Sequence, residues 1–211
     1  MNTLNVNSGE LLAIMTRSGM VESQHYGHLV LLNADGTILL ELGQPRAQMF
    51  PRSSIKSMQA VAMVRNGLNF EGRNLALACA SHGGTDEHQE VALENLVSVG
   101  LGADALMNTP DRPISDLARK AWGDKAPTSL AANCSGKHAA MVATCKTNNW
   151  DLTSYKNPNH LLQLAIANEF EILSGEQISH VAVDGCGAPL FALTLRGLAR
   201  AMRNLALSAD P

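Results

Sequence analysis

The sequence predicts an α+β fold in which helices flank an antiparallel sheet. Two short apolar segments, residues 28–32 and 37–42, surround an Asp-Gly turn and are typical of a β-hairpin. Several segments with apolar residues at helical spacing follow, and a late apolar segment, residues 178–183, precedes a final helix. Strands that are not regularly alternated with helices favour an α+β layout. The length of 211 residues suits one domain spanning residues 1–211.

The first third of the chain predicts an arm, a hairpin and a helix. Residues 1–17 are partly apolar and could form a short helix or an ordered arm. The hairpin of residues 28–42 is apolar on both faces, so we expect it inside a covered sheet. Residues 53–67 carry apolar side chains at helical spacing and end at a glycine, which predicts a helix that begins near Ser53.

The middle of the chain predicts a strand and a capped helix. The apolar residues 75–80 indicate a buried strand or hydrophobic segment that delivers Ser81 to a loop. Thr85 or Asp86 then caps a helix. Gln89 lies three residues after Asp86, a spacing that suits a capping box.

The rest of the chain predicts four helices and one strand. A short helix passes through residues 117–122 between prolines, and residues 131–148 contain a helix rich in alanine, methionine and valine. Residues 158–175 form a third helix, and residues 178–183 form a buried strand. The closing helix, residues 190–207, is amphipathic, with its arginines outward.

Composition excludes several classes of protein. Hydrophobic residues make up 45% and charged residues 17% of the chain, which indicates a folded protein. The net charge of −3 includes no block of like charge, which argues against a nucleic-acid partner. The start has no basic segment followed by a long apolar core, so we expect no signal peptide, no membrane span and a cytoplasmic protein. The four cysteines are therefore expected as thiols or metal ligands.

Ser53 and Lys56 form the first candidate catalytic group. They lie three residues apart at a predicted helix start, so the hydroxyl and the amine can meet on one face. A serine hydroxyl needs a base to act as a nucleophile, and a partly desolvated neutral lysine can serve. Ser-x-x-Lys is the arrangement of serine penicillin-recognising enzymes. The same tetrapeptide also occurs on solvated helix faces, and Ser54 could cap the helix.

A second candidate group is Ser81, His82 and Gly83. The glycine leaves room for the close approach of backbone or ligand. Ser81 could be a second nucleophile, a proton relay or a hydroxyl that fixes a substrate. It could equally be a serine that starts a loop before a helix.

Two cysteines and two basic residues form the third candidate group. Cys134, Lys137 and His138 lie at positions i, i+3 and i+4 of a predicted helix, and Cys186 lies in a glycine-flanked turn. Two thiols and a nitrogen ligand make a plausible zinc site with water in the remaining place. Spacing alone favours His138 over Lys137, because a lysine must lose a proton to bind a metal. Buried thiols without a metal are the alternative.

Several uncommon tracts occur in one order along the chain. They are Val21-Glu22-Ser23, Asp35-Gly36, Pro51-Arg52-Ser53-Ser54-Ile55-Lys56, Gln59-Ala60, Ser81-His82, His88, Asn133-Cys134-Ser135-Gly136-Lys137-His138, Gln163, Asp184-Gly185-Cys186-Gly187 and Pro189. In this order they resemble the asparaginase II family of thermolabile-type, zinc-binding L-asparaginases with a serine β-lactamase-like fold. The resemblance covers nearly the whole chain from Val21 onward.

The resemblance implies hydrolysis of L-asparagine to L-aspartate and ammonia. It implies that Ser53 and Lys56 are the nucleophile pair and that Ser81 is a second catalytic serine. It also implies zinc bound by two thiols and an amine, in place of the histidine that spacing favours. Those ligands would be Cys134, Lys137 and Cys186. The side chains that orient the ligands or the substrate would be Arg52, His82, His138 and Asp184.

The sequence departs from the family pattern at three points. Ser57 and Leu161 stand where the family usually has proline. Family members also continue with further strands and a Lys-x-Gly-Ala-Glu-Gly tract, so the resemblance implies a chain truncated at its C-terminus, about two-thirds of the family length. An exposed sheet edge would favour a homodimer. The alternatives are another serine acyl hydrolase of the β-lactamase-like group and an inactive zinc-binding remnant.

Overall fold

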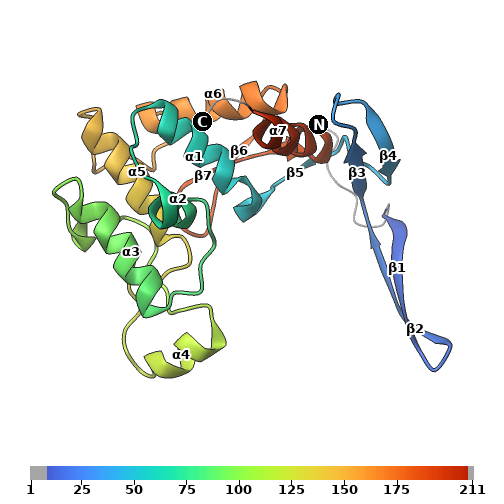
Figure 1. Ribbon diagram of the computed structural model, residues 1–211, viewed down its shortest axis with the longest axis horizontal. Coiled ribbons are helices and arrows are strands. Elements are labelled where there is room, and N and C mark those ends of the chain that lie inside the picture. Colours follow the sequence, from blue (N-terminus) through green and yellow to red (C-terminus); the bar gives the residue numbers. More distant parts are fainter. Residues whose placement is uncertain (1–8, 209–211) are drawn as a thin grey trace. The chain divides into compact units, whose positions relative to one another are not determined.

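The structure is a computed structural model that describes residues 9–208, and the chain divides into two compact units (Figure 1). The described part of unit 1 comprises residues 9–51, 170–180 and 191–208. Unit 2 comprises residues 52–169 and 181–190. The expectation of a single domain stays a prediction, because two compact units can belong to one domain.

Unit 1 begins with two β-hairpins. Strand β1 (Glu10–Arg17) pairs antiparallel with β2 (Met20–Gly27), and β3 (Leu29–Leu32) pairs antiparallel with β4 (Ile38–Leu42). The second hairpin confirms the prediction for residues 28–42. The first hairpin rules out the short helix that was one of two possibilities for residues 1–17, of which residues 1–8 lie outside the described part. Ser18 and Gly19, with φ of 49° and 83°, form the two-residue turn that closes it.

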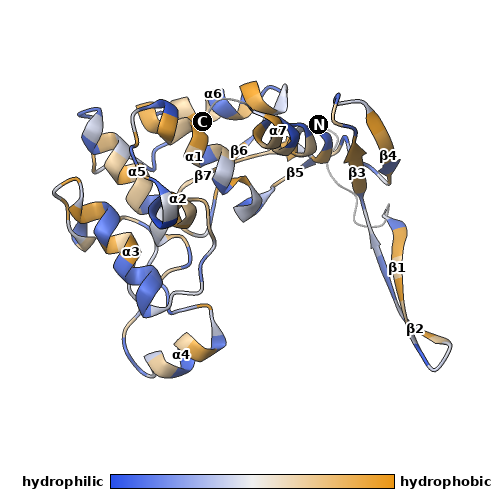
Figure 2. Cartoon of the chain, viewed as in Figure 1, coloured by the Kyte–Doolittle hydropathy of each residue, from blue (hydrophilic) through white to orange (hydrophobic). Residues whose placement is uncertain are grey.

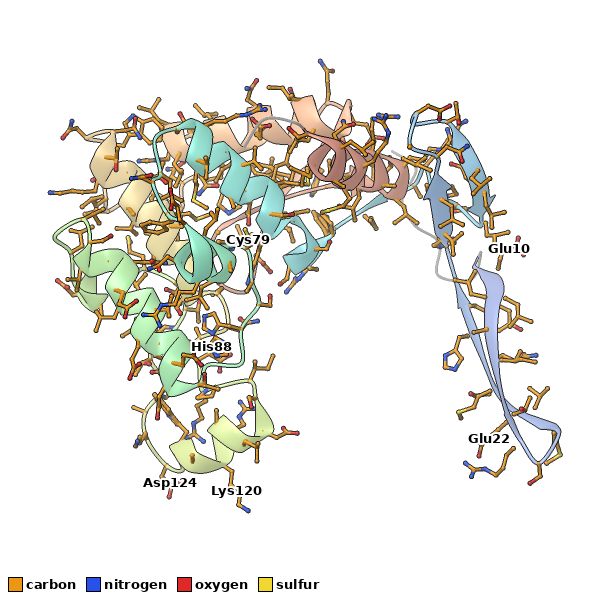
Figure 3. All side chains as sticks on the ribbon, in the orientation of Figure 1. Glu10, Glu22, Cys79, His88, Lys120 and Asp124 are labelled. Atoms are coloured by element: carbon orange, nitrogen blue, oxygen red, sulfur yellow. The ribbon has the colours of Figure 1, made fainter. Side chains whose placement is uncertain are left out.

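The apolar side chains of both hairpins are largely exposed. Met20 is 76% exposed and Leu39 is 65% exposed. Figure 2 shows hydrophobic residues along β1 and β4, and Figure 3 labels Glu10 and Glu22 along the first hairpin. Helix α7 (Leu195–Leu207) packs against β3, but no further strand of residues 9–208 pairs with β4. The expectation of a covered sheet is therefore wrong for the described residues, which form four two-stranded sheets. The α+β class is confirmed.

The end of unit 1 differs from the predicted closing helix of residues 190–207. The first of these residues belong to β7 (Pro189–Phe191) and β8 (Leu193–Thr194), and β8 pairs antiparallel with β5 (Gln48–Met49). The helix begins after Thr194, whose Oγ1 accepts a hydrogen bond from the N–H of Gly197 at 2.9 Å. A threonine cap thus stops the helix from extending back into the apolar residues.

Unit 2 is built around helix α5 (Ser135–Thr147), which is buried from Ser135 to Cys145 and packs against the neighbouring helices of the unit. Gly136 allows this packing, because a Cβ there would lie 2.5 Å from the carbonyl oxygen of Leu77. The other helices and helical turns of the unit are α1 (Lys56–Arg65), α2 (Gly72–Ala78), α3 (Asp86–Val97), α4 (Asp116–Trp122), α6 (Leu161–Ser174, which continues into unit 1), and the 3-10 turns η2 (Arg52–Ile55) and η3 (Ala103–Ala105). The helices predicted near Ser53 and at residues 117–122, 131–148 and 158–175 are confirmed.

Three local predictions in unit 2 are wrong in part. Residues 75–80 do not form a strand but lie mostly in helix α2, because alanine and leucine favour a helix and no β-branched residue opposes it. The alternative, a hydrophobic segment that leads Ser81 into a loop, agrees with the structure. Strand β6 (Val181–Val183) pairs with β7 but is not buried, since Val183 is 70% exposed at the edge of a two-stranded sheet. Thr85 caps α3, as one of the two predicted caps, but the capping box joins Thr85 to His88 and does not join Asp86 to Gln89.

Candidate active site and metal centre

A pocket of about 220 Å³ in unit 2 gathers most of the predicted site residues. Its lining comes from η2, α1, the start of α5, the loop after η3 and the turn between β6 and β7. The residues are Arg52, Ser53, Lys56, Thr109, Asp111, Ala132, Asn133, Cys134, Lys137, Asp184, Gly185 and Cys186. Segments far apart in the sequence therefore meet at one site.

Lys56 is the buried base of this pocket. Only 4% of the residue is exposed, and its Nζ donates to the carbonyl oxygens of Ala80 at 2.6 Å and Asn133 at 3.2 Å. The third contact is with the Oγ of Ser81 at 2.9 Å. Burial, helped by the nearby Lys137 charge, lowers the pKa of Lys56 to about 8. A useful fraction of the amine is therefore neutral near pH 8.

The two serines relate to Lys56 differently from the sequence expectation. Ser53 lies exposed in turn η2 and lines the same pocket as Lys56. Within residues 9–208, no side-chain hydrogen bond joins these two residues. Ser81 provides the hydroxyl that contacts the amine, although it lies on a different segment. The 3-10 geometry of η2 explains the change, because Ser53 precedes the regular α-helical turn on which the i, i+3 argument depends.

His82 lies behind the pocket and joins Ser81 to helix α5. Its Nδ1 accepts the N–H of Gly84 at 3.2 Å, so the neutral ring carries its proton on Nε2, which lies 2.9 Å from the Oγ of Ser135. The ring stacks on His88 of α3, which Figure 3 labels, with centroids 5.1 Å apart. Burial lowers the pKa of His82 to about 4, and it is therefore neutral near pH 7.

Arg52 and Asp184 form an ion pair at the pocket. Nη2 of Arg52 lies 2.9 Å from Oδ1 of Asp184, and the same oxygen accepts the N–H of Gly185 at 2.8 Å. Arg52 has a φ of 52°, an uncommon conformation for a residue with a Cβ. The backbone of η2 thus turns sharply at the residue that brings a cation to the pocket.

The two predicted thiols lie together at the base of the pocket. Cys134 caps α5, and Cys186 lies in the tight turn where the N–H of Gly187 donates to the carbonyl of Asp184. Lys137 Nζ lies 3.3 Å from the Sγ of Cys186. A hydrogen bond from Cys134 lowers the pKa of Cys186, and the same hydrogen bond, together with burial, raises the pKa of Cys134. The pair therefore favours one thiolate, on Cys186.

His138 completes a group that could hold a metal. One ligand atom each from Cys134, His138 and Cys186 lie within 4.8 Å of one another, and all three residues are buried. Nδ1 of His138 lies 2.7 Å from the hydroxyl of Tyr155, while the buried Nε2 makes no hydrogen bond of good geometry among the described residues. Burial lowers the pKa of His138 to about 4. Sulfur and neutral nitrogen donors suit a metal of the zinc type.

Comparison with known proteins decides the family. Residues 13–211 match the family described as L-asparaginase II. The chain belongs to the L-asparaginase II family. A comparison with curated protein sequences gives no match. Membership in this family indicates an enzyme that acts on a small molecule, and it agrees with the resemblance that the motifs carry.

Three site residues of this L-asparaginase II family member are not predicted from the sequence. Thr109 and Asp111 line the pocket, and the N–H of Thr109 lies 3.4 Å from the carbonyl of Cys186. Tyr155 contacts His138 from a loop before α6. None stands in a recognisable motif. The one available signal is that the chain has only two tyrosines, and the hydroxyl of a buried tyrosine usually has a hydrogen-bond partner.

No helix in the described part of this family member is long and apolar enough to cross a membrane. The expected lack of a membrane partner and the expected lack of a nucleic-acid partner stay predictions.

Proposed function

We propose that the chain hydrolyses L-asparagine to L-aspartate and ammonia through a serine–lysine acyl-enzyme mechanism. The observation that carries the proposal is the buried Lys56, which contacts Ser81 at 2.9 Å and shares a pocket with Ser53. Membership in the L-asparaginase II family supplies the substrate class. We also propose the thermolabile, zinc-binding type of this family, with its β-lactamase-like fold.

Proton transfer to Lys56 begins the proposed reaction. Two carbonyl acceptors hold the amine, so a neutral Nζ can direct its lone pair toward a serine hydroxyl. Ser53 is the proposed nucleophile, and Ser81 is a second catalytic serine that relays the proton. The serine oxygen bonds to the side-chain amide carbon, the tetrahedral intermediate collapses with loss of ammonia, and water then hydrolyses the ester. The N–H of Ser53 is a candidate donor to the oxyanion.

Two charged side chains of the pocket, Arg52 and Asp184, would fix the orientation of the substrate. An α-amino acid carries one ammonium and one carboxylate, and the pocket offers the Arg52 guanidinium and the Asp184 carboxylate. Arginine suits a carboxylate because its planar fork can donate two parallel hydrogen bonds. We propose that these two residues bind the two charged groups of asparagine, which leaves its side-chain amide for the serine.

We propose that Cys134, Lys137 and Cys186 hold a zinc ion. The donor set fits the ion, because the thiol pair favours a thiolate and Lys137 Nζ lies 3.3 Å from Cys186. His138, with a buried Nε2 that lacks a well-formed hydrogen bond, lies beside the same sulfurs. When bound, zinc supplies a Lewis acid that would hold the carboxylate of the substrate, or its amine in the neutral form.

The function is tested by ammonia release from L-asparagine with the purified chain. We expect Ser53→Ala, Ser81→Ala and Lys56→Met each to lose at least about a thousandfold in kcat/KM. Ser57→Ala, which directly follows Lys56 on α1 and lies outside the pocket lining, is the matched control and should keep its activity. Turnover of a chromogenic β-lactam without asparagine hydrolysis would favour another acyl hydrolase of the β-lactamase-like group.

We also propose that the chain forms a homodimer. The support is the exposed apolar surface of the β1–β2 hairpin together with its open strand edges, which are features that favour pairing. Light scattering after size-exclusion chromatography tests this, and a monomer at all concentrations would contradict it.

A further inference from the structure

Tyr155 is a fully buried tyrosine with its hydroxyl between two partners. Its exposed fraction is 0%, the N–H of Met107 donates to its hydroxyl oxygen at 3.1 Å, and Nδ1 of His138 lies 2.7 Å from the same oxygen. The two rings pack edge to face with centroids 5.6 Å apart. The hydroxyl of Tyr155 therefore lies between the N–H of Met107 and the ring of His138, and its contact with His138 is short.

The positions of the protons in this group follow from its donors. A backbone N–H can only donate, so the Tyr155 oxygen accepts from Met107. The phenol proton then needs an acceptor, and Nδ1 of His138 is the remaining hydrogen-bond partner of the hydroxyl in the described structure. If Nδ1 carried the ring proton instead, the phenol proton would be buried without an acceptor, which is costly. Nδ1 therefore accepts, and the neutral imidazole carries its proton on Nε2.

We propose that Tyr155 is a positioning residue that keeps the ring proton of His138 on Nε2, beside the Cys134–Cys186 thiol pair. An Nε2 that bears a proton has no lone pair for a metal, so His138 stabilises a thiolate and does not ligate zinc. Lys137, with Nζ 3.3 Å from Cys186, is then the nitrogen ligand. This inference rests on the proposed zinc site. Within that site it gives Lys137 and His138 separate roles.

Neighbouring contacts hold Tyr155 in place. Gln163, itself 0% exposed, donates from Nε2 to the carbonyl of Tyr155 at 2.8 Å. Lys156 donates to the carbonyl of Met107, the residue whose N–H binds the Tyr155 hydroxyl. Two residues further along, the N–H of Thr109 reaches the carbonyl of Cys186. The loop of residues 107–109 therefore connects Tyr155 directly to the turn that carries a thiol.

The first test is the tautomer of His138. Two-bond ¹⁵N–¹H correlation spectra of histidine-labelled protein, metal-free and zinc-loaded, distinguish protonated Nδ1 from protonated Nε2. The His138 signals are assigned by their loss in His138→Gln. We expect the Nε2-protonated form in both samples. A proton on Nδ1 in either sample, or a ring nitrogen shifted by direct zinc ligation, overturns the proposal, and this measurement needs no Tyr155 variant to fold.

The second test is metal affinity in Tyr155→Phe, which keeps the ring and removes the hydroxyl. Zinc affinity, measured by competition with a chelating dye, should fall about 10- to 100-fold, as for other residues that orient metal-site side chains. In the His138→Gln background the same change should have no further effect. The chain's other tyrosine, Tyr26, is 61% exposed, and Tyr26→Phe is the matched control.

The two tests separate this inference from the proposed zinc site. If the wild-type chain binds no zinc, the zinc site fails, and the tautomer spectra of the metal-free protein alone decide the role of Tyr155. In that case Tyr155→Phe must alter the His138 signals for the role to stand. A zinc affinity in Tyr155→Phe within twofold of wild type, or an undiminished effect in the His138→Gln background, overturns it.

Discussion

The Nζ of Lys56 lies 2.9 Å from the Oγ of Ser81, although 25 residues separate the two in sequence. The lysine comes from the first turn of α1, and the serine follows α2. Two main-chain carbonyls hold the same amine, at Ala80 and Asn133. The amine is thus positioned by backbone from two segments, and its protonation should control the reaction.

The pH profile of asparagine hydrolysis should report Lys56. Burial lowers its pKa from 10.5 to about 8, so the neutral base becomes abundant above that pH. Because the base must be neutral to accept a proton, kcat/KM should rise with pH and level off above about 8. Ammonia release measured across this range gives the midpoint. A midpoint near the ordinary lysine value, or a rate that falls over this interval, would contradict a role as base.

The Arg65–Glu169 ion pair should stabilise unit 2 more than a surface pair stabilises unit 1. Nη1 of Arg65 lies 2.9 Å from both carboxylate oxygens of Glu169, whose side chain is only 5% exposed. Arg65→Met leaves this carboxylate buried without its cation. We expect a loss of about 2 kcal/mol in the free energy of unfolding, less than for a fully buried pair because Arg65 is half-exposed.

The matched control for that loss is the exposed pair of Arg17 and Glu22. Its side chains are 75% and 37% exposed at a separation of 2.8 Å. Arg17→Met should cost less than about 1 kcal/mol. Urea unfolding followed by circular dichroism measures both variants. Equal losses would show that burial of Glu169 does not control the strength of the pair.

Sequence reasoning located the site better than it located the strands. Ser53, Lys56, Ser81, Cys134 and Cys186 are predicted because the chemistry requires these residue types. Arg52, Asp184 and Lys137 as a ligand come from the family resemblance, and most of the candidates line one pocket. Hydrophobic pattern alone misjudged residues 75–80, where an apolar run fits either a buried strand or a helix. It also predicted that both faces of the β3–β4 hairpin are covered, whereas in the described chain α7 packs against β3 and no further strand joins the pair.

Contacts between distant segments could not be predicted from spacing. The i, i+3 rule pairs Ser53 with Lys56, but the amine turns to Ser81 because α2 and α5 bring its carbonyl acceptors together. The link from Tyr155 to His138 depends likewise on how the loop before α6 packs. Local periodicity carries no information about such tertiary contacts.

Gly136 should be required for the packing of α5 on α2. A Cβ at this position would lie 2.5 Å from the carbonyl oxygen and 2.6 Å from the Cγ of Leu77, and the backbone oxygen cannot move aside easily. Gly136→Ala should therefore lose about 2 kcal/mol or more in unfolding free energy, despite the better helix propensity of alanine.

Gly185→Ala controls for an added methyl group. A Cβ there meets only the flexible end of Arg52, at 4.0 Å, so its effect on unfolding should stay within about 0.5 kcal/mol. Thermal and urea melts of both variants decide the matter. A stable Gly136→Ala protein would mean that α2 and α5 can separate without cost, contrary to the packing in unit 2.

Removal of the metal should lower the stability of the protein through the thiol pair. Zinc that binds only the folded chain adds about 2.7 kcal/mol at a concentration a hundredfold above its Kd, so dialysis against a chelator should lower the melting temperature and added zinc should restore it. Cys186→Ser removes the thiolate, and its bound zinc should fall from about one per chain to near zero. Cys79→Ser, altered at the end of α2 and away from the pocket, should bind and respond like wild type. Because both variants replace one sulfur by oxygen, a difference between them reports the metal rather than a general loss of packing. Equal zinc content in the two variants would show that the thiol pair does not hold the ion.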